Sequence, residues 1–287
     1  MSRDFLQQMA ASSRARVESA RRSISDAEML GRALATHTPP ALRLHPRSFD
    51  LIAEMKLRSP AVGQLKSEGE DVEARVTAYA RAGAAAVSVL TEPTRFDGSM
   101  DHLAAAARAL ASTRVPAMRK DFIVDAYQVS EARAAGAGGV LVILRMLPRA
   151  EIDVLLERAR ELGLFVLLEG FDERDIEQMH ELAAGPSLPK MLVGVNCRDL
   201  TTLQVVPERL EKLAPLLPTN VPRVAESGVG TPEDAGRMAA AGYELALVGS
   251  ALMRGGDPGA LARDMLEAGR SARQAGLTGA RLADGPA

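Results

Sequence analysis

Charged and amide side chains recur in this sequence directly at the ends of short apolar runs. They are Glu54, Lys56, Lys120, Glu169, Asn196, Arg198 and Glu226. Such side chains almost never occupy a protein core unless they are paired. Lysines and carboxylates that share a partly buried site shift one another's pKa values in opposite directions, so one site can hold both a general acid and a general base. The pattern predicts proton-transfer chemistry.

The apolar runs themselves predict buried strands. They cover residues 51–55, 86–90, 115–119, 139–144, 164–169, 191–196, 222–226 and 245–249. Continuous apolar runs without alternation are typical of parallel strands covered by helices on both faces. Between them, apolar residues three and four apart predict helices, and several of these end in Gly.

Strand-helix units that recur eight times predict an α/β protein with a single (β/α)8 TIM barrel. An open, doubly wound sheet of eight strands is the alternative. No glycine-rich nucleotide-binding loop follows any of the strands, which disfavours both the open sheet and a dinucleotide or NTP ligand.

A barrel would gather the polar side chains at one rim, because active sites of this fold lie at the carboxyl ends of the strands. Side chains two apart on a strand share a face, so Glu54 and Lys56 should point the same way, as should Asn196 and Arg198. Cys197 should then face away from the site. A single polar strand end is often only a solvated edge, but convergence of several on one rim favours a catalytic site.

Two glycine-bearing turns follow the last two predicted strands, at residues 227–230 and 249–253. Many barrels bind a phosphate there through backbone N–H groups. Gly can also serve only to permit the tight turn. Both turns at the expected pair of strands favour a phosphorylated small-molecule substrate, to which Lys56 on the neighbouring first strand could add a point charge.

The chain divides into three parts. Residues 1–46 are predicted to be an N-terminal helical extension, with one or two amphipathic helices over 2–36, that packs on the barrel. Residues 47–275 form the barrel, and residues 276–287 are predicted to be a disordered tail.

Composition excludes several classes of function. Lys and Arg number 35 against 37 Asp and Glu, so no strong net charge draws the chain to nucleic acid or to an anionic membrane. One cysteine excludes an intrachain disulfide and fits a reducing compartment, and no apolar run could span a bilayer. The four histidines fall outside the strand ends, which disfavours a metal site. We expect a soluble cytoplasmic protein.

Eight ordered motifs then connect the chain to a known family. They are IAEMKLRSP, SVLTEPTRFDGS, PAMRKDF, AYQVSEARAAGA, GLFVLLEGFDE, GVNCRDL, VAESGV and LVGSALM. Together they resemble the indole-3-glycerol-phosphate synthase family of tryptophan biosynthesis, over residues 49–258. The resemblance implies a carboxy-lyase that converts 1-(2-carboxyphenylamino)-1-deoxyribulose 5-phosphate to indole-3-glycerol phosphate, with loss of carbon dioxide and water and without metal or cofactor.

The resemblance also implies roles for individual residues. The catalytic set it implies comprises Glu54, Lys56, Lys120, Glu169, Asn196 and Glu226, with Lys120 beside the sugar carbonyl and Glu54, Lys56 and Glu169 in proton transfer. The substrate-binding set comprises Ser59, Phe96, Phe122, Arg198, Ser227, Gly228, Gly249 and Ser250, with the last four as the phosphate cradle and the two phenylalanines as walls of the aromatic pocket.

Several positions depart from the family pattern. Gly170 and Phe171 replace a usual Val-His pair, Cys197 and Asp199 replace asparagines, residues 59–62 read Ser-Pro-Ala-Val, and Arg95 stands where an aromatic is common. These departures leave open a paralogue that supplies indole for secondary metabolism.

Three further alternatives remain open. A Schiff-base aldolase or lyase would use Lys56 or Lys120 as its nucleophile. Phosphoribosylanthranilate isomerase shares the fold but works through a Cys/Asp-type pair. A non-catalytic paralogue would have lost a catalytic side chain, and no such loss is seen. We expect a monomer or weak homodimer, with other tryptophan-pathway enzymes as an open option for a partner.

Overall fold

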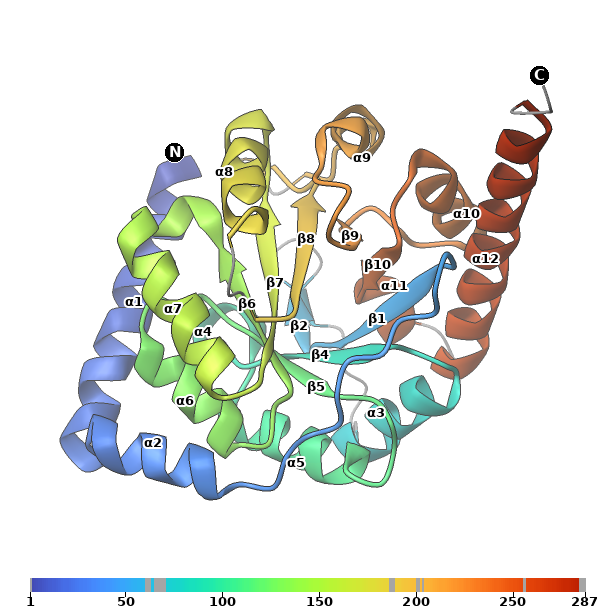
Figure 1. Cartoon of the computed structure of the whole chain (residues 1–287). Coiled ribbons are helices and arrows are strands. Elements are labelled where there is room, and N and C mark those ends of the chain that lie inside the picture. The colour runs from blue at the N-terminus through green and yellow to red at the C-terminus, as the bar shows by residue number, and fades with distance from the viewer. Residues whose placement is uncertain are drawn as a thin grey trace.

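Eight parallel strands close into a barrel in the computed structural model (Figure 1). The model describes residues 2–59, 63–64, 71–185, 189–199, 202, 204–254 and 257–283. The barrel strands are β1 (Asp50–Met55), β4 (Ala86–Leu90), β5 (Ala117–Lys120), β6 (Gly139–Ile143), β7 (Phe165–Gly170), β8 (Met191–Asn196), β9 (Arg223–Glu226) and β10 (Leu245–Val248). Each pairs with the next in chain order and β10 pairs with β1, so the predicted barrel is confirmed.

Helices follow the strands and surround the barrel (Figure 1). They are α3 (Val72–Arg81), α4 (Pro93–Phe96), α5 (Met100–Leu110), α6 (Ala126–Ala134), α7 (Arg149–Glu161), α8 (Glu173–Ala183), α9 (Glu208–Leu213), α10 (Pro232–Ala241), α11 (Ser250–Arg254) and α12 (Pro258–Ala283), with short 3-10 turns η1 (Leu144–Met146) and η2 (Ala214–Leu216). Several begin at a side-chain cap, such as Asp125 before α6 and Asp172 before α8.

The core has two layers. Inside the barrel, apolar side chains from facing strands pack together, among them Ile52, Met118 and Leu192. A second and larger layer lies between the strands and the helices. Near the carboxyl ends of the strands, the inward positions change from apolar to charged, so the interior of the barrel opens there into a polar pocket.

The N-terminal extension consists of two helices, as expected, α1 (Ser2–Ser23) and α2 (Asp26–Ala35). Helix α2 packs against α6 on the outside of the barrel, and α1 carries Phe5 to the mouth, where its ring meets Phe122 edge-on at a centroid distance of 5.9 Å. The extension therefore contributes to the surface of the pocket.

Three details differ from the sequence expectations. Strands β5 and β9 begin just after Pro116 and Pro222, because proline has no N–H to donate to the neighbouring strand. A short hairpin that was not anticipated, β2 (Arg58–Ser59) and β3 (Gly63–Gln64), follows β1. Helix α12 runs past residue 275 to Ala283, into the segment for which disorder was predicted, because Ala, Leu and Arg there favour helix. The rest of the predicted tail lies outside the described residues.

Candidate active site

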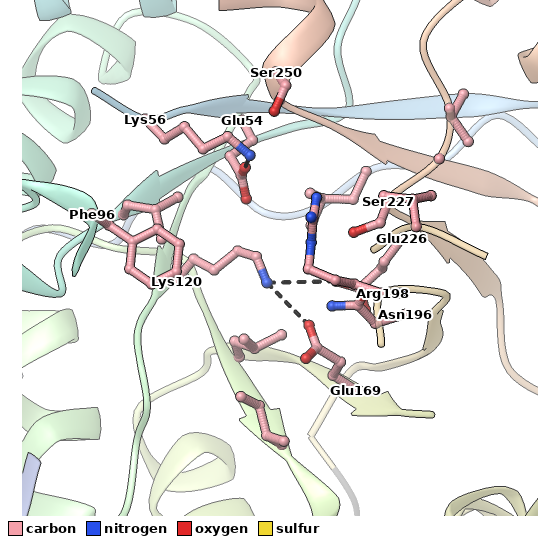
Figure 2. A pocket seen from close by; sticks show the side chains of 18 of the residues that line it. Glu54, Lys56, Phe96, Lys120, Glu169, Asn196, Arg198, Glu226, Ser227 and Ser250 are labelled. Atoms are coloured by element: carbon pink, nitrogen blue, oxygen red, sulfur yellow. Dashed lines mark hydrogen bonds and ion pairs between the residues drawn. The ribbon is translucent and has the colours of Figure 1, made fainter. Parts of the chain in front are cut away.

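A pocket of about 480 Å³ opens at the carboxyl ends of the barrel strands. Figure 2 shows charged side chains converging in it from strands on opposite sides of the barrel. Those predicted at the strand ends all line it, namely Glu54, Lys56, Lys120, Glu169, Asn196, Arg198 and Glu226. The gathering of these groups at one rim is therefore confirmed.

Lys120, the last residue of β5, reaches across the pocket to two carboxylates (Figure 2). Its Nζ lies 3.1 Å from Glu169 Oε2 and 3.6 Å from Glu226 Oε2. Burial lowers the pKa of Lys120, but the negative charges of Glu169, Glu226 and Glu54 outweigh burial and raise the pKa above its usual range. Lys120 is therefore an ammonium group at neutral pH, positioned to donate a proton or to stabilise an oxyanion.

Glu226, at the end of β9, is almost completely buried, and neither of its carboxyl oxygens has a hydrogen-bond partner among the residues that the structure describes. Burial and the neighbouring charge of Glu169 raise its pKa well above the ordinary value, against the opposing effect of Lys120. A buried polar group without a hydrogen bond is costly to the folded state, and the ion pair with Lys120 at 3.6 Å supplies none. Its presence in the pocket indicates a group that a ligand can satisfy.

A second lysine–carboxylate pair lies on β1 and in the loop that follows it. Lys56 Nζ is 2.8 Å from Glu54 Oε1, so the two side chains share a face as expected. Burial raises the pKa of Glu54, but the charges of Lys56 and Lys120 outweigh it and hold the pKa below its usual value. Glu54 is thus an ionised carboxylate beside an ammonium, and this pair can accept and return a proton.

Gly249 explains how this pair fits beneath the turn after β10. A Cβ at residue 249 would overlap Glu54 Oε1 and would lie 3.0 Å from Lys56 Nζ. Any side chain there would displace the pair, so the turn requires glycine for close approach.

The turns after β9 and β10 form the polar end of the pocket. Ser227 and Gly228 have positive φ angles of 67° and 72°, so two successive residues adopt the left-handed conformation after Glu226. Such a conformation is strained for serine and is typical of functional sites. Ser250 begins α11 directly after Gly249, and all four predicted cradle residues line the pocket. Backbone N–H groups at this end suit a phosphate.

The opposite end of the pocket is apolar. Phe96 and Phe122 line it, with ring centroids 6.2 Å apart, as predicted for walls of an aromatic site. Phe5, Ile143 and Phe171 line the pocket as well and belong to, or pack against, the same apolar cluster as Phe122. The pocket therefore has one end suited to an anion, one suited to a flat apolar ring, and the charged pairs between them.

A buried network fixes the end of β5, with Lys120, and the residues that follow it, with Phe122. Asp121 accepts hydrogen bonds from Arg119, from Thr91 at 2.7 Å and from Arg16 of α1 at 2.8 Å. Burial raises the pKa of Asp121, but the arginines outweigh it and hold the pKa well below its usual range. This permanently ionised carboxylate joins the extension to the end of β5, immediately beside Lys120.

Comparison with known proteins identifies the protein family of this chain. The model of the family described as indole-3-glycerol phosphate synthase matches residues 6–265. A protein of that name from Parafrankia sp. is 46% identical over 76% of this chain and 78% of its own length. One from Nocardioides sp. is 44% identical over 85% of this chain and 92% of its own length. The chain belongs to the indole-3-glycerol phosphate synthase family.

Solved structures with the same architecture are more distant. The 3-hexulose-6-phosphate synthase of Salmonella typhimurium superposes with a TM-score of 0.60 at 14% identity, covering 77% of this chain and 98% of its own. A thiamine phosphate pyrophosphorylase of Pyrococcus furiosus gives a TM-score of 0.57 at 17% identity, over 79% of this chain and 99% of its own. At such identities the likeness supports the barrel fold alone.

Most other residue predictions for this indole-3-glycerol phosphate synthase family member can be placed in the structure. Cys197 is buried against the outer layer, away from the pocket, and burial raises the pKa of its thiol to about 11. Arg198 donates its backbone N–H to Asn196 Oδ1 at 3.0 Å, so the two sit together as expected. Ser59 lies in β2, but its side chain is outside the described residues.

Sequence reasoning did not assign several residues that line the pocket, among them Phe5, Leu6, Asp121 and Phe171. Phe171 carried a signal, because it lies two residues after Glu169 and so continues the same face of the chain. Asp121 directly follows Lys120 in the PAMRKDF motif, so its position beside Lys120 was the available signal. The two residues of α1 carried none, since an amphipathic pattern does not say which surface a helix covers.

Neither a metal-binding group nor a membrane span emerges from the described part of the chain. Its His, Cys, Asp and Glu side chains form no group of three or more arranged to hold a metal ion. None of its helices is long and apolar enough to cross a bilayer.

Proposed function

We propose that this pocket converts 1-(2-carboxyphenylamino)-1-deoxyribulose 5-phosphate to indole-3-glycerol phosphate, with the residues described above as its machinery. The observation that carries the proposal is the arrangement of two lysine–carboxylate groups between a phosphate-binding end and an aromatic end of one pocket. Membership of the family supports the reaction, and the positions of the side chains in the pocket support the roles that we assign to them.

The substrate would lie across the barrel mouth. Its phosphate would meet the turns at Gly228 and Gly249, and its aryl ring would lie between Phe96 and Phe122. Arg198 would bind the ring carboxylate, because a guanidinium matches the two oxygens of a carboxylate. This orientation places the sugar carbonyl between the ends of the substrate, within the charged middle of the pocket.

The first step forms the carbon–carbon bond. The ring carbon that bears the carboxylate attacks the sugar carbonyl, and the carbonyl electron pair moves to oxygen, which takes a proton from Lys120. The carbon–carboxylate bond then breaks, carbon dioxide leaves, and its electron pair restores the aromatic ring. The raised pKa of Lys120 keeps it protonated for this role.

The second step removes water. The new hydroxyl leaves with a proton from an acid, and a base removes a proton from the neighbouring carbon to complete the indole double bond. We assign these transfers to the Glu54–Lys56 pair and to Glu169, and their ion pairs in the middle of the pocket support the assignment. Each is a side chain of this protein, and we propose that the reaction uses no metal or cofactor.

A Schiff-base mechanism is less well supported. An amine must lose its proton before it can attack a carbonyl, and the carboxylates around Lys120 hold it as an ammonium. Borohydride trapping with a carbonyl substrate tests this alternative directly.

The test of the proposed function is to incubate the purified protein with the anilino-deoxyribulose phosphate and to follow indole fluorescence, with the product identified by mass. We expect indole-3-glycerol phosphate and equimolar carbon dioxide. A folded protein that forms no indole product contradicts the proposal. A cytoplasmic location, a monomeric or weakly dimeric state, contact with other tryptophan-pathway enzymes and a role in secondary metabolism stay predictions. Gel filtration tests the oligomeric state.

A further inference from the structure

The residue pair Gly170 and Phe171 departs from the family pattern at the end of β7, next to Glu169. Helix α8 comes so close to β7 here that a Cβ on residue 170 would lie 2.7 Å from Asp175 Cβ and 2.8 Å from Met179 Cε. Glycine at 170 therefore permits the first turn of α8 to approach the strand end. In Figure 1 α8 stands directly beside β7.

This close approach fixes the backbone of Phe171. Asp175, in the first turn of α8, accepts the N–H of Phe171 at 2.7 Å. The same carboxylate accepts a hydrogen bond from Nε of Arg145 at 3.0 Å, and Arg145 also donates to Asp172 at 2.7 Å. Arg145 comes from η1, after β6, so the contact joins two neighbouring loops at the mouth.

The guanidinium of Arg145 then covers the ring of Phe171. Its central carbon lies 4.5 Å from the ring centroid, within the range of a cation–π contact. The ring is only 3% exposed and belongs to the same apolar cluster as Leu6, Phe122 and Ile143. Phe171 is therefore held from both its backbone and one face, and it is a rigid part of the pocket wall.

Phe171 also lines two spaces. It lines the catalytic pocket and, with Arg145, Asp172 and Arg198, a second pocket. Removing the ring would join the two pockets at the apolar end of the first, beside Glu169. A smaller side chain would leave room there for a larger aromatic ligand.

We propose that Phe171, clamped by Arg145 and Asp175, limits the size of the aryl group that the pocket accepts and so determines specificity for the ring of the substrate. The inference rests on the proposed function for the identity of that ring. It assigns Phe171 as a specificity-determining residue and Arg145 as a positioning residue that acts through it.

The experiment measures Kd by calorimetry for a non-reacting substrate analogue, the anilino-deoxyribitol phosphate, with and without a methyl group at each open position of the aryl ring. In Phe171→Ala we expect the affinity for at least one methylated analogue to rise about tenfold relative to the affinity for the unsubstituted analogue. One extra methylene in an apolar pocket typically changes discrimination by at least about this factor. Arg145→Met should shift the same ratio in the same direction by a smaller factor, whereas Arg149→Met, an exposed arginine on α7 with partners of its own, should not shift it.

Ratios within twofold of the parent for every analogue, in a folded Phe171→Ala protein, overturn the proposal. If that variant does not fold, Phe171→Leu gives the same test with a smaller cavity. Turnover of the unsubstituted substrate by the parent tests the proposed function separately, because the binding ratio does not require catalysis. A parent that binds the analogues with the expected ratios but forms no indole would contradict the function and not the role of Phe171.

Discussion

Buried carboxylates have different hydrogen-bond partners at the two ends of the barrel. At the amino ends of the strands, Asp50 accepts both the backbone N–H and the ring Nδ1 of His45 at 2.7 Å. Glu244 accepts three hydrogen bonds from Arg223 at 2.8–3.0 Å. At the carboxyl ends, Glu226 has no hydrogen-bond partner in the described part of the chain, and Lys120 is shared between two carboxylates. Asp50 and Glu244 at the amino ends are hydrogen-bonded within the protein, whereas Glu226 at the carboxyl ends lacks, among the described residues, a hydrogen bond that a ligand could supply.

Two glutamates show what this difference does to proton affinity. Burial raises the pKa of Glu244, but hydrogen bonds from Arg223 outweigh it, and the pKa lies below the usual value. Burial, reinforced by Glu169, raises the pKa of Glu226. The same side chain therefore stabilises the fold at one end of the barrel and costs stability at the other. Perturbed carboxyls in a cleft are typical of catalytic sites.

The largest expected effect is at the catalytic end. Lys120→Met removes the ammonium while keeping a similar length, and we expect turnover to fall about a hundredfold or more, in the range of a lost general acid. Substrate affinity should change much less. Steady-state kinetics of indole formation measure both, after circular dichroism has shown that the variant is folded. Turnover within threefold of the parent would remove Lys120 from the mechanism and move the acid role to Lys56 or Glu169.

The next effect tests the close packing of the mouth. Gly249→Ala places a Cβ against Glu54 Oε1, so we expect kcat/KM to fall by roughly tenfold or more through displacement of the Glu54–Lys56 pair. Gly31→Ala on α2 is the matched control, since a Cβ there meets nothing within 4 Å. Equal activity of the two variants would show that the pair does not depend on the turn.

The third prediction concerns the amino end of the barrel. Glu244→Gln should lower the free energy of unfolding by about 1–3 kcal/mol, because a charged acceptor of several hydrogen bonds is lost. kcat/KM should stay within twofold. Since the folded pKa of Glu244 is below its unfolded value, its contribution is present above the ordinary carboxyl pKa and is lost as the pH falls through the folded pKa. Urea unfolding at neutral and acid pH checks this, and a variant that loses activity but not stability would contradict it.

The smallest effect is expected from metal removal. Exhaustive EDTA treatment should change the rate of indole formation by less than about twofold, because the proposed steps use only side chains of the protein. A tenfold loss that added metal restores would overturn the proposed mechanism.

The barrel and the charged rim at the carboxyl ends of its strands could be predicted from the sequence. Eight apolar runs with polar ends such as Glu169 and Asn196 predict a barrel with one charged rim, because strand period and burial are local properties of the chain. The glycine turns at Gly228 and Gly249 were likewise visible.

Side-chain pairings between distant segments could not be predicted from the sequence. Arg16 and Asp121 are 105 residues apart, and no local pattern pairs them. The same holds for Arg145 on Phe171, which joins the ends of β6 and β7. The direction of each carboxyl pKa also needs the structure, because Glu226 and Glu244 differ only in the neighbours that the fold gives them.

Urea unfolding of Glu226→Gln at neutral pH tests most directly whether Glu226 serves a ligand and not the fold. The folded pKa of Glu226 is raised, so its proton stabilises the fold at low pH, and this contribution is lost as the pH rises through the folded pKa. A neutral amide of similar shape avoids that loss. If Glu226 is held for a ligand, the free energy of unfolding should equal or exceed that of the parent while kcat/KM falls. A drop of about 1 kcal/mol or more, with kcat/KM unchanged, would show that Glu226 serves the fold as Glu244 does.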